Sequence, residues 1–366
     1  MAALSERARR LMRPSLAGLE PYDPGFTPTR VILSANENDY GMPAEVHDEV
    51  MAAMSGVATN RYPDPMSNRL RDAIAGWHGV ARGNVFVGDG GDECLFDLFL
   101  AFGGQGRRLV NCPPTFSVYA LYASMVDTEV VDVPRDPETM ALDAAATLAA
   151  AADADLVVLT SPNNPTGDLV PVDLVSKVCD ACPGLVLVDE AYGEFAPAGS
   201  SAEPLLPAHD NLIVLHTFSK AYCLAGARCG YLLAAPDVVD ALAAVRQPYS
   251  VSSLTQAAAE VVCRRRDAFE PAIASTVAER ARVIESIDAL GSSLPIRVWP
   301  SEANFVLVRV PHASQLRARL RDEYSILVRD FSDVDGLADC LRVTIGTPAE
   351  NDLLLDALAT LVKEES

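Results

Sequence analysis

Apolar residues in the middle of the chain gather in short continuous runs that alternate with helical patterns. Each run is bounded by Gly, Pro, Asp or Asn, and the runs are Asn84–Val87, Leu109–Cys112, Leu156–Thr160, Leu185–Val188 and Leu212–His216. Strands buried on both faces show this continuous apolar character, and helical connections between them make neighbouring strands parallel. The pattern predicts an α/β/α domain around a mostly parallel sheet.

The C-terminal third follows a different pattern. Residues 236–290 are helical and Ala-rich, with an interruption at Pro248. Beyond them come four β-rich runs and two helical segments: Ile296–Trp299, Phe305–Val310, Ile326–Arg329 and Leu341–Ile345, with helices at Ser314–Glu323 and Glu350–Val362. This mixture predicts a smaller α+β domain. We expect an N-terminal arm over residues 1–38, a large domain over 39–245 and a small domain over 246–366.

Composition narrows the possible functions. The 366 residues are 49% hydrophobic and 22% charged, as in a globular protein, and no apolar run approaches the roughly 20 residues that span a bilayer. The basic N-terminus lacks an apolar segment, so we expect a cytoplasmic protein. The net charge of −21 argues against nucleic-acid binding and requires local arginines to capture an anionic substrate.

Cysteine and histidine give no sign of a metal site. The eight cysteines are scattered, and the one C-x-x-C pair, Cys179 and Cys182, has no second pair to complete a zinc site. We therefore expect reduced thiols. The five histidines show no metal-ligand spacing, and no metal is expected.

The candidate chemistry lies where the predicted strands end, because ligands of layered α/β domains bind at the carboxyl ends of strands. The chain has only three lysines, and Lys220 follows a buried strand, whereas Lys177 and Lys363 lie in a helix and in the C-terminal tail. A lysine removed from water can lose its proton and attack a carbonyl, which arginine cannot do. Lys220 is therefore the candidate for a Schiff base with a cofactor.

Residues at the other strand ends suit pyridoxal phosphate. Asp189 needs a cationic partner if it is buried, and a protonated pyridine nitrogen is such a partner. Ser219, Arg228 and the glycine-rich segment at residues 88–93 could bind a phosphate. Asn164 and Phe116 supply an amide and a stacking face. The glycine segment departs from the dinucleotide fingerprint, since Glu93 stands at its third glycine.

The ordered motifs resemble the fold-type I aminotransferases, and specifically the histidinol-phosphate aminotransferase family. The likeness runs nearly end to end, through the segments 33–38, 61–65, 90–93, 113–117, 161–167, 189–192, 217–221, 224–231, 301–305, 328–329 and 341–347. Among these segments are Asn36-Glu37-Asn38, Arg61-Tyr62-Pro63, Asp189-Glu190-Ala191-Tyr192 and Thr217-Phe218-Ser219-Lys220. The resemblance implies a large α/β/α domain, a small α+β domain, and an arm that packs on the small domain and on a dimer partner.

The resemblance also assigns roles to residues. Lys220 would bind pyridoxal phosphate covalently and move the substrate proton, and Asp189 would pair with the ring nitrogen. The other implied cofactor contacts are Tyr192 and Asn164 at the phenolic oxygen, Phe116 on the ring, and Gly91, Asp92, Ser219, Arg228 and the second subunit's Tyr62 at the phosphate. Arg342 would anchor the anionic group of the substrate, with Arg329, Asn36 and Tyr22 nearby.

These roles imply a homodimer that moves nitrogen between glutamate and imidazole-acetol phosphate in histidine biosynthesis. Two other activities stay open: transamination of aromatic 2-oxo acids and decarboxylation of threonine phosphate. A non-catalytic regulator that binds the cofactor is a third alternative. The chain departs from the family pattern at His216, where arginine is usual, at Asp39, where proline is usual, and at Ser325, where glycine is common.

Overall fold

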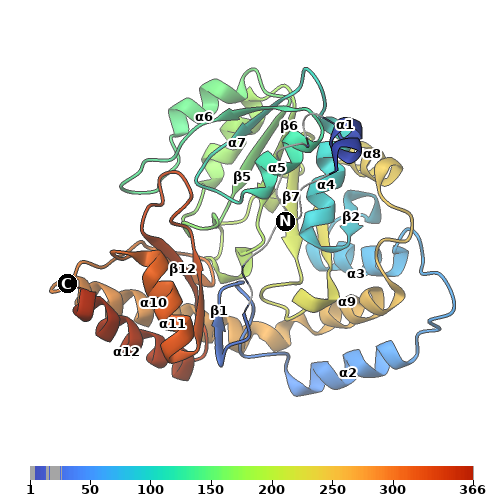
Figure 1. Cartoon of the computed structure of the whole chain (residues 1–366). Coiled ribbons are helices and arrows are strands. Elements are labelled where there is room, and N and C mark those ends of the chain that lie inside the picture. Colours follow the sequence, from blue (N-terminus) through green and yellow to red (C-terminus); the bar gives the residue numbers. More distant parts are fainter. Residues whose placement is uncertain (1–4, 14–15, 17–24, 26, 366) are drawn as a thin grey trace.

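The chain forms two β-sheets, each with helices packed against it. The structure is a computed structural model and describes residues 5–13, 16, 25 and 27–365. The C-terminal strands and helices lie together with β1 (Val31–Leu33), beside a larger part that holds the middle of the chain (Figure 1). A short helix, α1 (Glu6–Leu11), precedes both parts.

The larger sheet has seven strands in the order β2-β8-β7-β6-β5-β3-β4. Five neighbouring strands are parallel, and β8 is antiparallel to both of its neighbours, so β2 runs in the same direction as β7. The strands are β2 (Val85–Gly88), β3 (Arg108–Asn111), β4 (Glu129–Asp132), β5 (Leu156–Thr160), β6 (Leu185–Asp189), β7 (Leu212–Thr217) and β8 (Gly230–Leu233). The carboxyl ends of β2, β3, β5, β6 and β7 therefore share one edge.

Helices cover both faces of this sheet, as continuous apolar strands require. One apolar core joins the sheet to α4 (Gly90–Phe102), α5 (Val118–Met125) and α8 (Pro236–Val245). The core on the other face joins it to α2 (Ala44–Ser55), α3 (Asn68–His78), α6 (Ala144–Ala151), α7 (Val172–Ala181) and α9 (Ser253–Arg265). Side chains alternate between these cores along each strand, so Val188 faces the second core and Leu187 the first.

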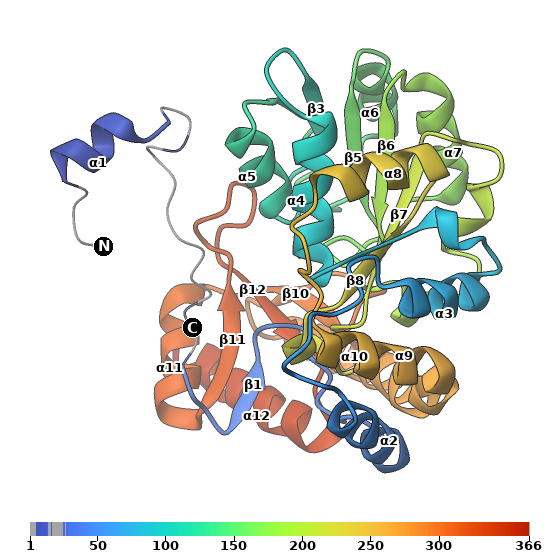
Figure 2. The same ribbon diagram turned by 90° about the vertical axis from the view of Figure 1, so that its right-hand side faces the viewer.

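The smaller sheet has five strands in the order β1-β11-β12-β10-β9. Its strands are β1, β9 (Arg297–Val298), β10 (Phe305–Arg309), β11 (Ile326–Asp330) and β12 (Cys340–Thr344). Three helices, α10 (Glu270–Gly291), α11 (Ala313–Tyr324) and α12 (Pro348–Glu365), form a separate apolar core with it. The N-terminal β1 pairs parallel to β11, which places it on the C-terminal sheet (Figure 2).

The predicted α/β architecture is confirmed, and each of the nine predicted strands overlaps a strand of the structure. Three strands were not predicted: β1, β4 and β8. Strand β4 lies at an edge of the sheet and no residue in it is buried, so it lacks the apolar run by which the others were recognised. In the described part of the chain, no helix is both long and apolar enough to cross a membrane.

Candidate active site

Loops from the shared carboxyl edge of the large sheet bring the predicted residues together. The segment after β2 begins α4, the loop after β3 holds Phe116, and the loop after β5 holds Asn164. Asp189 ends β6, and Lys220 lies three residues beyond the end of β7. Neighbouring parallel strands thus place a carboxylate, an amide and an amine at one edge, where the sequence predicted a site.

Asp189 is a buried carboxylate with a fixed orientation. Its side chain is on the α4 and α5 face, because it pairs in register with Leu215, which faces that core. Tyr119 donates a hydrogen bond to Oδ2 at 2.7 Å, and the Ala191 N–H donates to Oδ1 at 3.0 Å. Burial raises the pKa of Asp189, and these two hydrogen bonds partly offset that increase. A positive partner would favour the ionised form further.

Lys220 is half-buried, and its amine donates a hydrogen bond to the carbonyl of Ala35 at 2.9 Å. Nζ lies 5.9 Å from the centre of the Tyr192 ring. Burial and the nearby Arg342 guanidinium lower the pKa of Lys220 to about 8, against the opposing charges of Glu37 and Asp92. At pH 7 about a tenth of this amine is therefore unprotonated, far more than of an ordinary lysine, and the unprotonated form is the nucleophile toward a carbonyl.

The start of α4 and Arg228 form a cradle suited to a phosphate. The Arg228 guanidinium lies so close to Gly90 that a Cβ at that position would overlap it, and Gly90 has a φ of 81°. Nη2 of Arg228 donates to Asp92 Oδ2 at 2.9 Å. Ser219, buried beside this region, accepts a hydrogen bond from Thr217 Oγ1 at 3.0 Å. The free N–H groups of the first helical turn add further donors for an anion.

Asn36 and Tyr192 form a buried network that links the two sheets. Asn36 donates from Nδ2 to the Tyr192 hydroxyl at 3.0 Å, and its Oδ1 accepts from Thr344 at 3.1 Å. Asn304 Nδ2 donates to the Asn36 carbonyl at 3.0 Å. The Tyr192 ring packs edge-on against Phe305 with ring centres 5.0 Å apart. Asn36 thus contacts Tyr192 directly, which makes it a positioning residue for that hydroxyl.

Arg342 and Arg329 project from adjacent strands of the small sheet. They are directly opposite in the β11–β12 pairing, so both side chains leave the same face. Arg342 is buried and donates to Asn164 Oδ1 and to the Ser34 carbonyl, both at 2.6 Å. The two guanidinium groups concentrate positive charge on one face of the small sheet. The pair is consequently suited to bind an anionic group.

Two of the predicted residues are not brought to this cluster by the described part of the chain. Tyr62 is 81% exposed and stacks on Tyr249 with ring centres 4.6 Å apart. Tyr22 lies outside the described residues. Phe116 is half-buried beside the site, where it packs edge-on against Tyr119 with ring centres 5.6 Å apart.

Several residues of the site carried no assigned role in the sequence. Tyr119 holds Asp189 from α5, and Thr160 donates to the Tyr119 hydroxyl at 2.9 Å. The backbone carbonyls of Ser34 and Ala35 accept from Arg342 and Lys220. Sequence motifs specify side chains, so they cannot predict which backbone carbonyls will accept these hydrogen bonds. Only the packing of α5 on the sheet brings the Tyr119 hydroxyl to the end of β6.

The three departures from the family pattern lie at defined places. Ser325 has a φ of 57°, a region that glycine adopts without strain, and its hydroxyl accepts from the Arg30 N–H at 2.8 Å beside β1. Burial, together with Glu350 and Glu37, raises the pKa of Asp39 to about 7. Burial alone would lower the pKa of His216, but Glu203, Glu190 and Glu194 outweigh it and raise that pKa to about 9.

The lowered pKa of Lys220 can be tested in the cofactor-free protein. Competitive acetylation of the three lysines across a pH series should show Lys220 reaching half its maximal reactivity near pH 8. Arg342→Leu should move this midpoint upward, since it removes a positive charge that disfavours the ammonium. Exposed Lys177, paired with Asp173 on α7, serves as an internal reference. An unchanged midpoint in Arg342→Leu would show that this guanidinium does not act on the amine.

Comparisons with known proteins identify the family of the chain. The family described as aminotransferase class I and II matches residues 28–358. A histidinol-phosphate aminotransferase from Thermobifida fusca is 40% identical over 95% of this chain and 95% of its own length. Histidinol-phosphate aminotransferase 1 from Carboxydothermus hydrogenoformans is 38% identical over 96% of this chain and 99% of its own.

A solved structure extends the agreement to the fold. The histidinol-phosphate aminotransferase from Sinorhizobium meliloti, in complex with pyridoxal 5'-phosphate, superposes with a TM-score of 0.85 over all of both chains at 27% identity. Full-length matches in sequence and in fold thus point to one family. The chain belongs to the class I and II aminotransferases and, within them, to the histidinol-phosphate aminotransferase family.

Proposed function

We propose that the chain transfers an amino group between glutamate and imidazole-acetol phosphate, and so acts as a histidinol-phosphate aminotransferase in histidine biosynthesis. The observation that carries the proposal is the pair of opposed arginines, Arg329 and Arg342, of which Arg342 lies near the amine of Lys220. Glutamate and the phosphate ester share an anionic group, and this pair would bind it in either substrate. The near full-length relatives with that activity support the assignment.

The site fits pyridoxal phosphate at its phosphate end. Gly90 and Gly91 begin α4 with free backbone N–H groups, and Gly90 leaves room for Arg228. Gly230 lets β8 pack closely against the start of α4, since a Cβ at Gly230 would lie 2.5 Å from the Gly91 nitrogen. Gly91, Asp92, Ser219 and Arg228 would hold the phosphate through backbone N–H groups, a hydroxyl and a guanidinium.

The site also fits the ring of the cofactor. Asp189 would face the pyridine nitrogen, Phe116 would stack on the ring, and Tyr192 with Asn164 would donate hydrogen bonds to the phenolic oxygen. When bound, pyridoxal phosphate supplies a carbonyl carbon for the amine and an electron-poor ring that stabilises negative charge next to it. The carboxylate of Asp189, held by Tyr119, would keep the nitrogen protonated.

The residues of the chain would then position the substrate and move its proton. Arg342 and Arg329 hold the anionic group and so orient the substrate's Cα toward Lys220. The amine of Lys220, with its lowered pKa, takes the proton from that Cα. Asn36 keeps the Tyr192 hydroxyl in place through its hydrogen bond at 3.0 Å. Because the net charge of the chain repels anions, these local cations provide the capture.

We further propose a cytoplasmic homodimer as the functional unit. The exposed Tyr62 ring would reach the phosphate seat of the partner subunit, and this would explain why an aromatic residue in a family motif stands 81% exposed on a single chain. The arm over residues 1–38 would pack on the small domain, 246–366, and on the partner, with the large domain over 39–245. The pairing of β1 with β11 supports the first of these contacts.

The substrate assignment can be tested with Arg329→Ala and Arg342→Ala. Removing one guanidinium from a desolvated, charge-assisted contact should cost about 2–4 kcal/mol, or roughly 30- to 1000-fold in kcat/KM. Arg342→Ala should impair both half-reactions, whereas Arg329→Ala should impair the phosphate ester more than glutamate, because a phosphate carries more charge. Each half-reaction is followed separately by the change in cofactor absorbance, with Arg321→Ala, on the surface of α11, as the control.

Three results would contradict the histidinol-phosphate assignment. Phenylalanine could be the better substrate of the unmodified enzyme, with equal losses for phenylalanine and histidinol phosphate in Arg329→Ala. The activity would then be that of an aromatic aminotransferase. Release of carbon dioxide from threonine phosphate, without transamination, would indicate the decarboxylase. Cofactor binding without turnover of any of these substrates would indicate the regulator.

The dimer can be tested by pairing Tyr62→Ala with Lys220→Ala in one mixed dimer isolated by two affinity tags. Tyr62→Ala alone should lower kcat/KM about 10- to 100-fold by removing a hydrogen bond to a charged phosphate, and Lys220→Ala alone should be inactive. If Tyr62 acts across the interface, the mixed dimer has one intact site and recovers up to half of the wild-type activity. Activity no higher than that of Tyr62→Ala would place Tyr62 in its own subunit's site.

A further inference from the structure

A second cluster of chemically active side chains lies apart from the active site. A cavity of about 350 Å³ is lined by two histidines and three glutamates, namely His78, His216, Glu190, Glu194 and Glu203. His216 lies two residues after Val214 on β7, so both side chains leave the sheet on the α3 and α9 face, whereas Asp189 faces the α4 and α5 core. The cavity therefore lies on the opposite face of the sheet from the Asp189 carboxylate.

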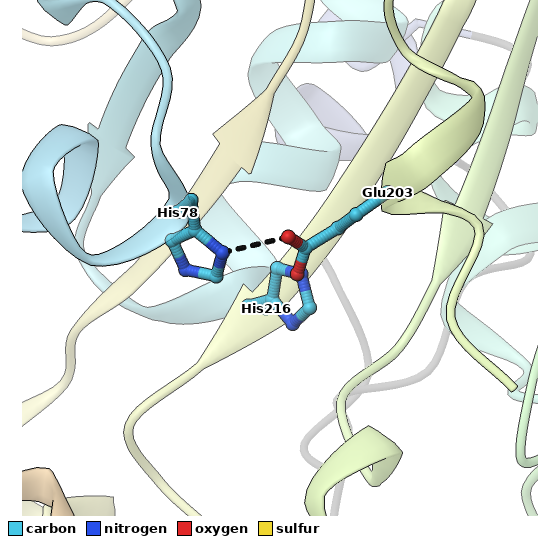
Figure 3. Close-up of side chains that lie close together, drawn as sticks. All are labelled: His78, Glu203 and His216. Atoms are coloured by element: carbon cyan, nitrogen blue, oxygen red, sulfur yellow. Dashed lines mark hydrogen bonds and ion pairs between the residues drawn. The ribbon is translucent and has the colours of Figure 1, made fainter. Parts of the chain in front are cut away.

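Three donor atoms converge from three separate elements. His78 is the last residue of α3, His216 lies in β7, and Glu203 begins the short 3₁₀ helix η4 (Glu203–Leu205). Nδ1 of His78 is 2.8 Å from Glu203 Oε2, and Nε2 of His216 is 2.9 Å from Glu203 Oε1. The donor atoms of all three lie within 4.8 Å of one another, and the carboxylate lies beside both rings (Figure 3).

The surroundings orient the imidazole of His78 as imidazoles are oriented in metal sites, with one ring nitrogen held by a polar partner. The Tyr231 hydroxyl lies 2.8 Å from Nε2 of His78, so a proton on that nitrogen leaves the Nδ1 lone pair directed at the cluster. Tyr231 is also the cross-strand neighbour of His216, and their rings stack with centres 5.3 Å apart. One tyrosine thus fixes the position of both rings.

Polar atoms in this cavity lack hydrogen-bond partners. His216 is 6% exposed, and its Nε2 makes no hydrogen bond of acceptable geometry within the described chain, although Glu203 is close. Oε2 of Glu194 is also buried without a partner among the described residues. Glu190, by contrast, accepts from the Ser201 hydroxyl at 2.7 Å and from the Ala202 N–H. Buried polar atoms without hydrogen-bond partners require an explanation, and a bound ion or water is one that fits this donor set.

We propose that His78, Glu203 and His216 bind one divalent transition-metal ion of the zinc type. Two imidazole nitrogens and one carboxylate are a donor set for zinc or cobalt, whereas magnesium and calcium prefer oxygen alone. Tetrahedral coordination at bond lengths of about 2.0–2.1 Å needs donor atoms roughly 3.3 Å apart, so small side-chain rotations suffice. The fourth position faces the cavity, where water or Glu194 would complete the coordination.

The ion would join α3, β7 and η4, which are distant in sequence. His216 precedes Lys220 by only four residues. Its side chain nevertheless leaves the sheet on the face opposite to the Asp189 carboxylate, so we expect the ion to have a structural role rather than a catalytic one. An ion that binds the folded chain stabilises it in proportion to the logarithm of the ion concentration. A ring nitrogen cannot hold a proton and a metal at once, so binding should strengthen as pH rises.

Cobalt(II) provides a direct readout because its visible absorption reports the ligand set. Untagged holoenzyme in phosphate-free buffer is titrated with cobalt, and equilibrium dialysis gives the stoichiometry. We expect one ion per chain, a tetrahedral cobalt spectrum and a rise in the thermal midpoint. His216→Arg, which places the usual family residue beside Glu203, and His78→Gln should each weaken binding by more than about 100-fold. Tyr231→Phe should weaken it about 10- to 100-fold.

A matched control separates this site from other histidines. His209→Gln alters an imidazole that also lies near a carboxylate, 3.6 Å from Asp180, but outside the cluster, so it should bind cobalt like the unmodified chain. Circular dichroism and the cofactor spectrum check that each variant is folded. No stoichiometric binding to the unmodified chain would overturn the proposal. Equal binding by His216→Arg and His78→Gln, both folded, would also overturn it, since the ion would then lie elsewhere.

Discussion

A carboxylate buried at the end of β6 is the constraint from which the active site is built. Asp189 is 4% exposed, and a charge removed from water to that extent costs several kcal/mol unless opposite charge and hydrogen bonds offset it. From the described residues it receives two hydrogen bonds, one from Tyr119 and one from the Ala191 N–H. The cationic nitrogen of a bound pyridine ring would supply the opposite charge. In this account the carboxylate and the cofactor stabilise each other.

The segment 34–36 connects residues that follow strands of the large sheet, Lys220 and Tyr192, to Arg342 on the small sheet. Its three residues contact Arg342, Lys220 and Tyr192 in turn. The segment directly follows β1, which belongs to the small sheet, whereas Lys220 and Tyr192 follow strands of the large sheet. A displacement of the small sheet would therefore reach the amine and the phenol through three consecutive residues. Substrate binding by Arg342, as proposed, would be coupled in this way to the position of Lys220.

Sequence patterns predicted those parts of the structure that depend on residues close together along the chain. The continuous apolar runs predicted the buried strands, and the strand ends predicted where Asp189, Asn164 and Lys220 would meet. Strand β4 was missed because an exposed edge strand has no continuous apolar run. The hydrogen bond from Tyr119 to Asp189 was missed because it depends on how α5 packs. His78 and His216 are 138 residues apart, so no spacing rule could have joined them.

The central claim is that Asp189 acts on the cofactor nitrogen rather than merely filling the core. Asp189→Asn keeps the shape of the side chain and removes its charge. Single-turnover absorbance should show that the cofactor is still bound and that proton transfer is slowed by about 10³-fold or more. Asp97→Asn is the matched control, since Asp97 is also a buried carboxylate, 3% exposed on α4, and should leave this rate unchanged. A rate in Asp189→Asn close to that of the unmodified enzyme would contradict the account.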